Sequence, residues 1–276
     1  MRINSNNEWS KLKSVVVGSA TNANWPSDDP VFALESQKTT WQATPIPSGP
    51  VPDWIIAEAN EDLDVLASTL EQLGVEVWRP AVMNFQQLGG MYNYCPRDRL
   101  LVYGDTIVDT TMMYPCRDME YQCYIDYLDE ADRIIHMPRN AGMTLDAANI
   151  LRITKDKWLF LESSSGNRAA YDWLCKQLPE VDIELCNFYA GVHIDSTIVP
   201  IRNKLVLLNG TRVNEDNCPK ALKDWEKIWI HDVLSQGFYE YPYASKWIAM
   251  NMLVVDPHTV ICDRNQIDLI DISHKT

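Results

Sequence analysis

A strand–turn–strand pattern recurs along this chain about every fifty residues, and such a period indicates a repeated supersecondary unit. In the first copy, residues 99–103 and 106–108 are β-prone apolar runs. Gly104 and Asp105 separate them, and such a dipeptide is typical of a tight turn. The same pattern predicts further hairpins at residues 150–162, 197–209 and 247–263.

A helical pattern and another short apolar run follow each of the first three hairpins, so the predicted unit is strand, strand, helix, strand. These elements are helices at 118–131, 169–178 and 219–234, and strands at 133–136, 181–186 and 238–241. Upstream, strands are predicted at 14–18 and 75–78, with a helix between them that ends at Gly74. The apolar face of that helix consists of Leu63, Leu66, Leu70 and Leu73.

Together these elements make five partial units, which predict one α/β domain over residues 1–276. The last unit is predicted to be incomplete, since the hairpin at 247–263 is expected to have neither a following helix nor a return strand. Residues 25–53 contain six prolines and are predicted to form a long irregular surface loop.

Composition narrows the class of partner. The chain has 24 Lys and Arg against 38 Asp and Glu, a formal net charge of −14, which argues against binding nucleic acid or an anionic membrane. An acidic protein suits a cationic ligand, although acidity also serves solubility. Seven cysteines without CxxC spacing favour reduced thiols, and no signal peptide or membrane span is predicted, so we expect a cytoplasmic protein. No metal or organic cofactor is predicted.

Three short segments place carboxylates and one histidine beside predicted strands: Asp98, Asp146, and His193 with Asp195. Paired carboxylates match the planar, charged fork of a guanidinium group. Each residue also has an ordinary alternative, because Asp is common in turns and caps and a histidine is often structural. The residues alone leave both interpretations open.

The order of these motifs resembles the amidinotransferase family, which includes glycine amidinotransferase and belongs to the pentein superfamily. The resemblance covers nearly the whole chain. The matching segments are Asn7 to Trp9, residues 15–18, 96–98, 145–149 and 193–195, Arg212, and residues 244–247 and 250–253. It implies a five-bladed α/β propeller of repeated units, and transfer of an amidino group from arginine or a similar guanidine to an amine acceptor such as glycine.

The resemblance also implies roles for individual residues. His193 matches the family's acid–base residue, and Asp146 matches the carboxylate that orients it. Asp98 and Asp195 match the pair that binds the guanidinium. Arg212 matches an anchor for a substrate carboxylate, and Ser245 a neighbouring hydroxyl contact; a solvated arginine is the alternative for Arg212.

The chain departs from the family pattern at three site positions, which leaves the donor and the acceptor open. Asn149 stands where the family has an acidic residue, Ala190 where it has asparagine, and Ala244 where it has the first of two serines.

A further departure concerns the nucleophile. The family's cysteine follows a glycine-rich stretch near the C-terminus, which this sequence lacks, so we predict a C-terminally truncated member. Cys95 is expected to be a pocket-lining thiol rather than a substitute. The alternatives are an inactive guanidinium-binding or scaffold protein, or one half of a split enzyme whose partner is a complementing C-terminal polypeptide; a homodimer is also open.

Overall fold

The computed structural model describes residues 3–26, 28–38, 47–189, 191, 193–235 and 245–275. The chain divides into two compact units. The first consists of Met1–Ser5 and Lys13–Ala147, and the second of Asn6–Leu12 and Ala148–Thr276.

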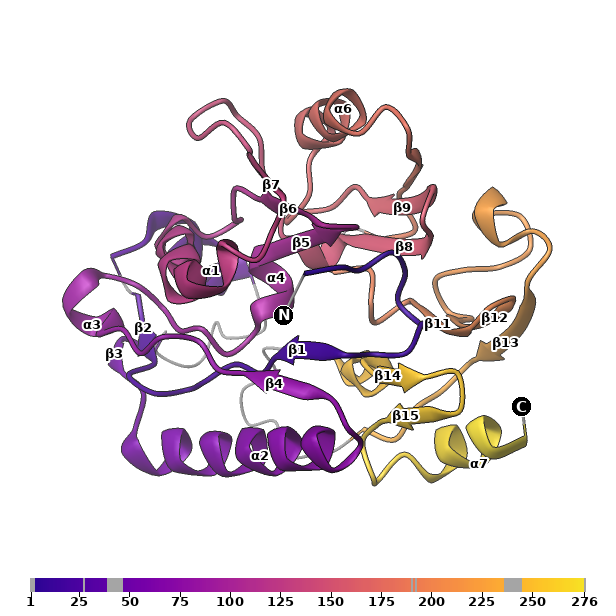
Figure 1. Cartoon of the computed structure of the whole chain (residues 1–276), viewed down its shortest axis with the longest axis horizontal. Helices are drawn as coiled ribbons and strands as arrows, with labels where there is room; N and C mark the ends of the chain where they lie inside the picture. Colours follow the sequence, from indigo (N-terminus) through magenta and orange to yellow (C-terminus); the bar gives the residue numbers. More distant parts are fainter. Residues whose placement is uncertain are drawn as a thin grey trace. The chain divides into compact units, whose positions relative to one another are not determined.

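The first unit begins with a strand–helix–strand motif (Figure 1). Strands β1 (Ser14–Val16) and β4 (Glu76–Trp78) pair in parallel and are connected through α2 (Asp53–Gln72). Leu63 and Leu70 of α2 are buried, whereas Leu73 is exposed and caps the C-terminal end of the helix. Gly74 follows with a φ of 79°, a conformation that glycine adopts without strain.

The described residues between 25 and 53 are more regular than predicted. The structure places helix α1 (Pro30–Lys38) there, and β3 (Gly49–Pro50) pairs with β2 (Asn24–Trp25). Asp29 explains the start of α1, because its Oδ1 accepts hydrogen bonds from the backbone N–H groups of Val31 and Phe32. Its Oδ2 accepts from the N–H of Cys116, which fixes this segment within the first unit.

The first unit then forms the first repeat. After α3 (Phe85–Leu88) and α4 (Pro96–Arg99), β5 (Leu100–Tyr103) and β6 (Thr106–Asp109) make the predicted hairpin. β7 (Arg133–His136) pairs with β6 in parallel, as a return strand does. The connection predicted as one helix at 118–131 is instead the 3₁₀ helix η1 (Pro115–Tyr124) followed by α5 (Ile125–Leu128).

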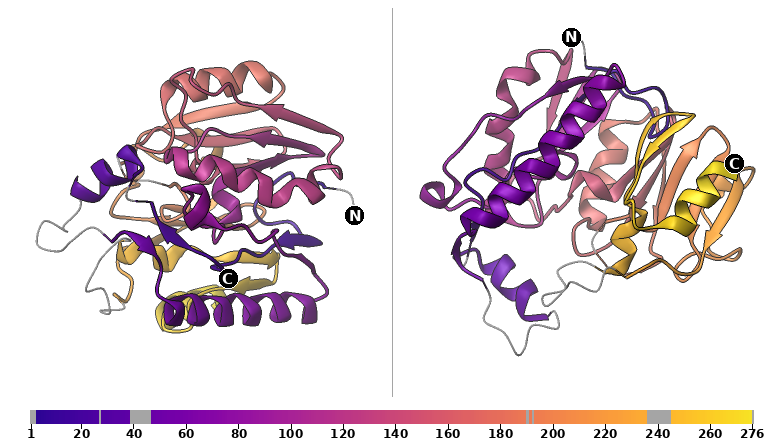
Figure 2. Two further views of the ribbon diagram at one scale, coloured as in Figure 1. Left: turned by 90° about the vertical axis from the view of Figure 1, so that its left-hand side faces the viewer. Right: turned by 90° about the horizontal axis from the view of Figure 1, so that it is seen from below.

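The second unit repeats this sheet twice. β8 (Ile150–Thr154), β9 (Lys157–Leu161) and β10 (Asp182–Cys186) form one sheet, and α6 (Arg168–Gln177) lies over it (Figure 2). β11 (Ile198–Arg202), β12 (Leu205–Asn209) and β13 (Glu226–Ile230) form the other. The middle strands β9 and β12 are almost continuously apolar and buried, as expected for strands that are covered on both faces.

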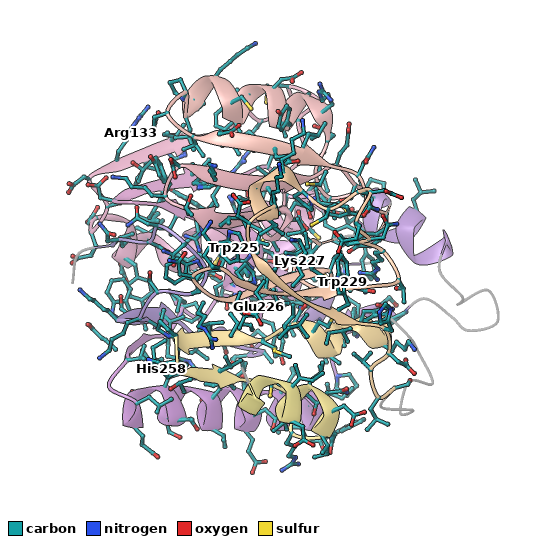
Figure 3. All side chains as sticks on the ribbon, turned by 90° about the vertical axis from the view of Figure 1, so that its right-hand side faces the viewer. Arg133, Trp225, Glu226, Lys227, Trp229 and His258 are labelled. Atoms are coloured by element: carbon teal, nitrogen blue, oxygen red, sulfur yellow. The ribbon has the colours of Figure 1, made fainter. Side chains whose placement is uncertain are left out.

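The prediction of a helix at 219–234 is wrong. That segment contains only the short η3 (Lys220–Leu222), and β13 pairs with β12 as the return strand. Leu222 and Trp225 pack into the core of the second unit, which fixes the backbone on either side of them. Figure 3 labels Glu226, Lys227 and Trp229 of this strand, and Trp225 immediately before it. The return strand predicted at 238–241 lies outside the described residues.

The last hairpin, β14 (Leu253–Asp256) and β15 (Thr259–Ile261), follows η4 (Lys246–Met250). Helix α7 (Ile267–Lys275) comes after it, so the prediction that no helix follows this hairpin is wrong. Leu269 of α7 is buried in the same apolar cluster as Trp247 and Val254, which explains why the helix forms here. Among the described residues, no sheet closes on itself.

The N-terminal strap of the second unit, Asn6–Leu12, is tied to β8 by side chains far apart in sequence. The Arg152 guanidinium donates from Nε to Glu8 Oε1 at 2.9 Å, and the Trp9 indole donates to the carbonyl of Ile153. These contacts explain why residues 6–12 belong to a different compact unit from the residues that flank them.

Candidate functional site

Asp98 lies on α4 of the first unit, next to an internal guanidinium. Nη1 of Arg117 donates to Oδ2 of Asp98 at 2.9 Å, and only 3% of the Arg117 side chain is exposed. Glu120 binds the other side of the same guanidinium with both oxygens, at 2.6 and 3.0 Å. The Arg117 Cζ also lies 4.9 Å from the centroid of the Tyr92 ring. The first unit thus holds one guanidinium with two carboxylates and an aromatic face.

Burial changes the protonation equilibria of this cluster. It raises the pKa of Glu120 to about 7, and the neighbouring charge of Arg117 only partly opposes that shift. For Arg117, burial alone would lower the pKa, but Glu120, Tyr92 and Asp98 outweigh it and hold the pKa above its ordinary value. Arg117 is therefore a permanent cation in this cluster.

Asp146 is 2% exposed and belongs to the first unit. Its Oδ1 accepts a hydrogen bond from the backbone N–H of Met113 at 2.8 Å, and the N–H of the preceding residue, Leu145, donates to the carbonyl of Thr111. The carboxylate is thus held against the segment that follows β6. A buried carboxylate with a fixed acceptor geometry is suited to orienting a partner group.

Asn149, a position at which the resemblance implies an acidic residue, has a structural role. Its Nδ2 donates to the carbonyl of Leu161 at 3.1 Å and to Ser163 Oγ at 2.9 Å, while its Oδ1 accepts from the hydroxyl of Ser165. Gly166 allows this packing, because a Cβ there would lie 2.3 Å from Asn149 Nδ2. The amide is needed here as a donor, which a carboxylate could not replace.

His193 and Asp195 precede β11 in the second unit, and both are half-buried. Ile194 between them is fully buried, and its N–H donates to the carbonyl of Ala148. The carbonyl of Ile194 in turn accepts from Thr197. This buried turn fixes the backbone that carries His193 and Asp195.

Arg212 follows β12 and is held by hydroxyl groups and an aromatic ring. Its Nη1 donates to Thr197 Oγ1 at 2.8 Å and to Ser196 Oγ at 3.0 Å. Its Cζ lies 3.9 Å from the centroid of the Tyr189 ring. Burial lowers the pKa of Arg212, and Tyr189 works in the opposite direction. No carboxylate of the described residues forms an ion pair with it. Arg212 is therefore a half-buried cation whose contacts are hydroxyl groups and an aromatic ring.

Ser245 is exposed and caps η4, where its Oγ accepts from the backbone N–H of Trp247 at 3.3 Å. This contact shows a capping role and brings Ser245 to none of the other predicted residues. Ala190 and Ala244 lie outside the described residues.

The structure thus groups some predicted residues and separates others by unit. Asp98 and Asp146 lie in the first unit, whereas His193, Asp195, Arg212 and Ser245 lie in the second. Tyr189 connects two of them, because its hydroxyl donates to the carbonyl of His193 and its ring contacts Arg212. The sequence offered no signal for Tyr189; for Arg117 and Glu120, their spacing of three residues was the only hint.

All seven cysteines are free thiols, of which Cys116, Cys123 and Cys186 are buried and the other four are half-buried. Burial is the main cause that raises the pKa above the ordinary thiol value at Cys116, Cys123, Cys175, Cys186, Cys218 and Cys262. A reactive cysteine needs the opposite shift. None of these six is an activated nucleophile in this structure.

The described residues were also compared with the requirements of a metal site and of a membrane-spanning helix. No group of three or more His, Cys, Asp or Glu side chains among them is arranged to hold a metal ion. None of their helices is both long enough and apolar enough to cross a bilayer.

Comparison with proteins of known structure identifies the fold of this chain. No protein-family model matches the chain. The solved structure of an inosamine-phosphate amidinotransferase from Streptomyces griseus superimposes with a TM-score of 0.89 at 35% identity, covering 99% of this chain and 88% of that one. A dimethylarginine dimethylaminohydrolase from Pseudomonas aeruginosa superimposes with a TM-score of 0.67 at 13% identity, which shows a shared fold alone. The chain therefore has the α/β fold of amidinotransferases and their pentein neighbours.

Sequence similarity then identifies the family. Inosamine-phosphate amidinotransferase 1 of Streptomyces glaucescens is 36% identical over 304 aligned positions, which cover 98% of this chain and 87% of the relative. The chain belongs to the amidinotransferase family.

Proposed function

We propose that this protein transfers an amidino group from arginine, or a closely related guanidine, to an amine. Its family membership supports the reaction class. The choice of arginine as the donor is supported by Arg212. This half-buried cation has hydroxyl and aromatic neighbours but no ion-pair partner among the described residues. Such a group suits the α-carboxylate of an amino-acid donor.

The acceptor is proposed to be an amine of the inosamine-phosphate kind. Support comes from the names of relatives: the inosamine-phosphate enzymes are 33% to 38% identical to this chain, whereas a glycine amidinotransferase of Xenopus tropicalis is 26% identical. Glycine is the second acceptor to test.

The proposed roles follow the chemistry of a guanidinium. Asp98 and Asp195 bind its N–H groups, and Asp98 can do so while paired with Arg117, because a carboxylate offers about four acceptor positions. A thiolate attacks the central carbon, and the bond from that carbon to the ornithine nitrogen breaks. His193, oriented by Asp146, gives its proton to that departing nitrogen and takes one back from the incoming amine. The amine then forms a bond to the same carbon, the carbon–sulfur bond breaks, and the thiolate is restored.

The thiolate is proposed to come from a cysteine outside these 276 residues, on a C-terminal segment or a complementing polypeptide. The raised pKa values of six of the cysteines support this proposal. We further propose that the repeated sheets surround a pseudo-fivefold axis, as in a five-bladed propeller, which is supported by the three copies of a hairpin with a parallel third strand.

Mass spectrometry of the chain incubated with arginine tests the assignment. We expect no amidino adduct on any of the seven cysteines, and no ornithine above background. Adding a family C-terminal segment that carries the cysteine is expected to produce the adduct on that segment and then turnover with an amine. An adduct on Cys95 with release of ornithine would contradict the assignment of the nucleophile.

A non-catalytic guanidinium-binding protein is the second candidate, and the absence of an activated thiol among those six cysteines favours it. Arginine binding without turnover, even when the complementing segment is bound, would support this candidate over the transferase.

A further inference from the structure

We infer that Tyr189 is the residue that positions Arg212 and thereby sets the preference for ligands that carry a carboxylate. This inference rests on the proposed function, since it concerns the site at which the donor binds. Tyr189 is a positioning residue in this scheme, because it acts through Arg212.

The first observation is the closeness of the ring to the cation. The Arg212 Cζ is 3.9 Å from the Tyr189 centroid, whereas other arginines that face aromatic rings lie farther away, such as Arg168 at 5.2 Å from Tyr171. The face of an aromatic ring attracts a cation without neutralising it. Tyr189 can therefore hold the guanidinium in place while leaving its charge for a ligand, which a carboxylate in the same position would not do.

The second observation is that the ring itself is fixed. Its hydroxyl donates to the carbonyl of His193 and lies 3.5 Å from Ser196 Oγ. A Cβ added to Gly191 would lie 1.7 Å from Tyr189 Cε2, so the ring packs directly against the backbone of that glycine. A larger residue at 191 would have to displace the ring.

The third observation concerns the donors that remain. The hydrogen bonds from the Arg212 guanidinium to Ser196 and Thr197 all come from Nη1. Nε and Nη2 form the other edge of the guanidinium, and that edge matches a carboxylate bidentately. Tyr189 and these two hydroxyls thus fix one edge and one face of Arg212, which prepares the opposite edge for the ligand.

The test compares arginine with agmatine, which has the same guanidinium but no carboxylate, by calorimetric titration of the full chain. In the unaltered protein we expect arginine to bind about tenfold more tightly or better. Tyr189→Leu is expected to weaken the binding of arginine but not of agmatine. Its ratio of arginine affinity to agmatine affinity should therefore fall to that of Arg212→Ala. Tyr189→Phe keeps the ring and should keep most of the ratio.

Two further variants make the result specific. Gly191→Ala should also reduce the ratio, because it displaces the ring without removing it. Tyr171→Leu is the matched control, since it removes an arginine–tyrosine contact of the same kind elsewhere in the second unit and should leave the ratio unchanged. Circular dichroism spectra establish that each variant is folded.

The outcomes separate this inference from the proposed function. A folded Tyr189→Leu protein with the full arginine preference, while Arg212→Ala loses it, would overturn the role of Tyr189 alone. Equal affinity for arginine and agmatine in the unaltered protein would overturn both this role and the anchoring role of Arg212. If Tyr189→Leu does not fold, a full ratio in Gly191→Ala overturns the inference.

Discussion

Nη1 of Arg117 donates to Oδ2 of Asp98 at 2.9 Å, so a carboxylate that is proposed to bind a substrate guanidinium already binds an internal one. The pair is nearly inaccessible to solvent, and Glu120 holds Arg117 from its other side. Breaking such a buried pair leaves a charge without its partner, which costs more free energy than the intact pair contributes. Asp98 is therefore expected to affect both stability and ligand binding.

We predict that Asp98→Asn lowers the free energy of unfolding by about 1–3 kcal/mol, because Arg117 loses one anionic partner. We also expect the stabilisation by arginine, measured as a rise in melting temperature, to become smaller. Asp195→Asn should reduce that rise as well. The control is Asp62→Asn, an exposed position on α2 that removes the same charge. An undiminished rise in both Asp98→Asn and Asp195→Asn would remove these residues from the site.

We predict that the titration of Glu120 makes the free energy of unfolding depend on pH. Its pKa in the folded protein is raised from 4.5 to about 7, so the protonated form is favoured on folding. Its contribution to stability is fully present below pH 4.5 and is lost as the pH rises through 7. The loss is about 3 kcal/mol by linkage.

We therefore expect Glu120→Gln to flatten the decline in unfolding free energy between pH 4.5 and 7, as measured by urea denaturation at several pH values. Glu71→Gln on the exposed side of α2 is the control and should keep the slope of the unaltered protein. A slope that does not change in Glu120→Gln would show that folding does not raise the pKa of Glu120.

Asn149→Asp tests whether the departure from the family pattern is structural. The change removes the Nδ2 donor to Leu161 and Ser163 and places a carboxylate in a fully buried position. We expect a loss of about 2–4 kcal/mol in the free energy of unfolding. Asn140→Asp, at an exposed position with a φ of 61°, should change it little. Equal effects at the two positions would contradict this account.

Gly18 should be intolerant of any side chain. A Cβ there would lie 2.1 Å from the carbonyl oxygen of Tyr94, and the backbone cannot move away as a side chain could. We expect Gly18→Ala to cost about 2 kcal/mol or more in thermal or urea unfolding. Gly142→Ala, where a Cβ meets nothing within 4 Å and only the φ of 69° is unfavourable, should cost about 1 kcal/mol. The reverse order of the two effects would show that the backbone near Tyr94 yields readily.

Much of the fold could be predicted from the sequence because its signals are local. Each hairpin depends on two adjacent β-prone runs and a short turn, and all four predicted hairpins are present. The apolar run that ends at Leu161 identified a strand that is buried on both faces. For these elements, neighbouring residues carry enough information to decide the backbone conformation.

β13 is an element that local sequence patterns did not predict correctly. The segment that contains it has a spacing of apolar residues compatible with a helix, and only pairing with β12 and the burial of Leu222 and Trp225 favour the strand. The helix α1 was missed for a similar reason, since proline content suggested a loop, but the carboxylate of Asp29 caps a helix there.

For the candidate site, too, the sequence determined some features and the tertiary structure determined others. The sequence by itself determined which residue types are present and in what order, and this order was enough to indicate the amidinotransferase family. Only the tertiary structure decided that Arg117 binds Asp98, that Asn149 is a buried donor, and that Tyr189 faces Arg212. These contacts join residues that are distant in sequence or that no local pattern distinguishes, and their energy depends on burial and geometry, which exist only once the chain has folded.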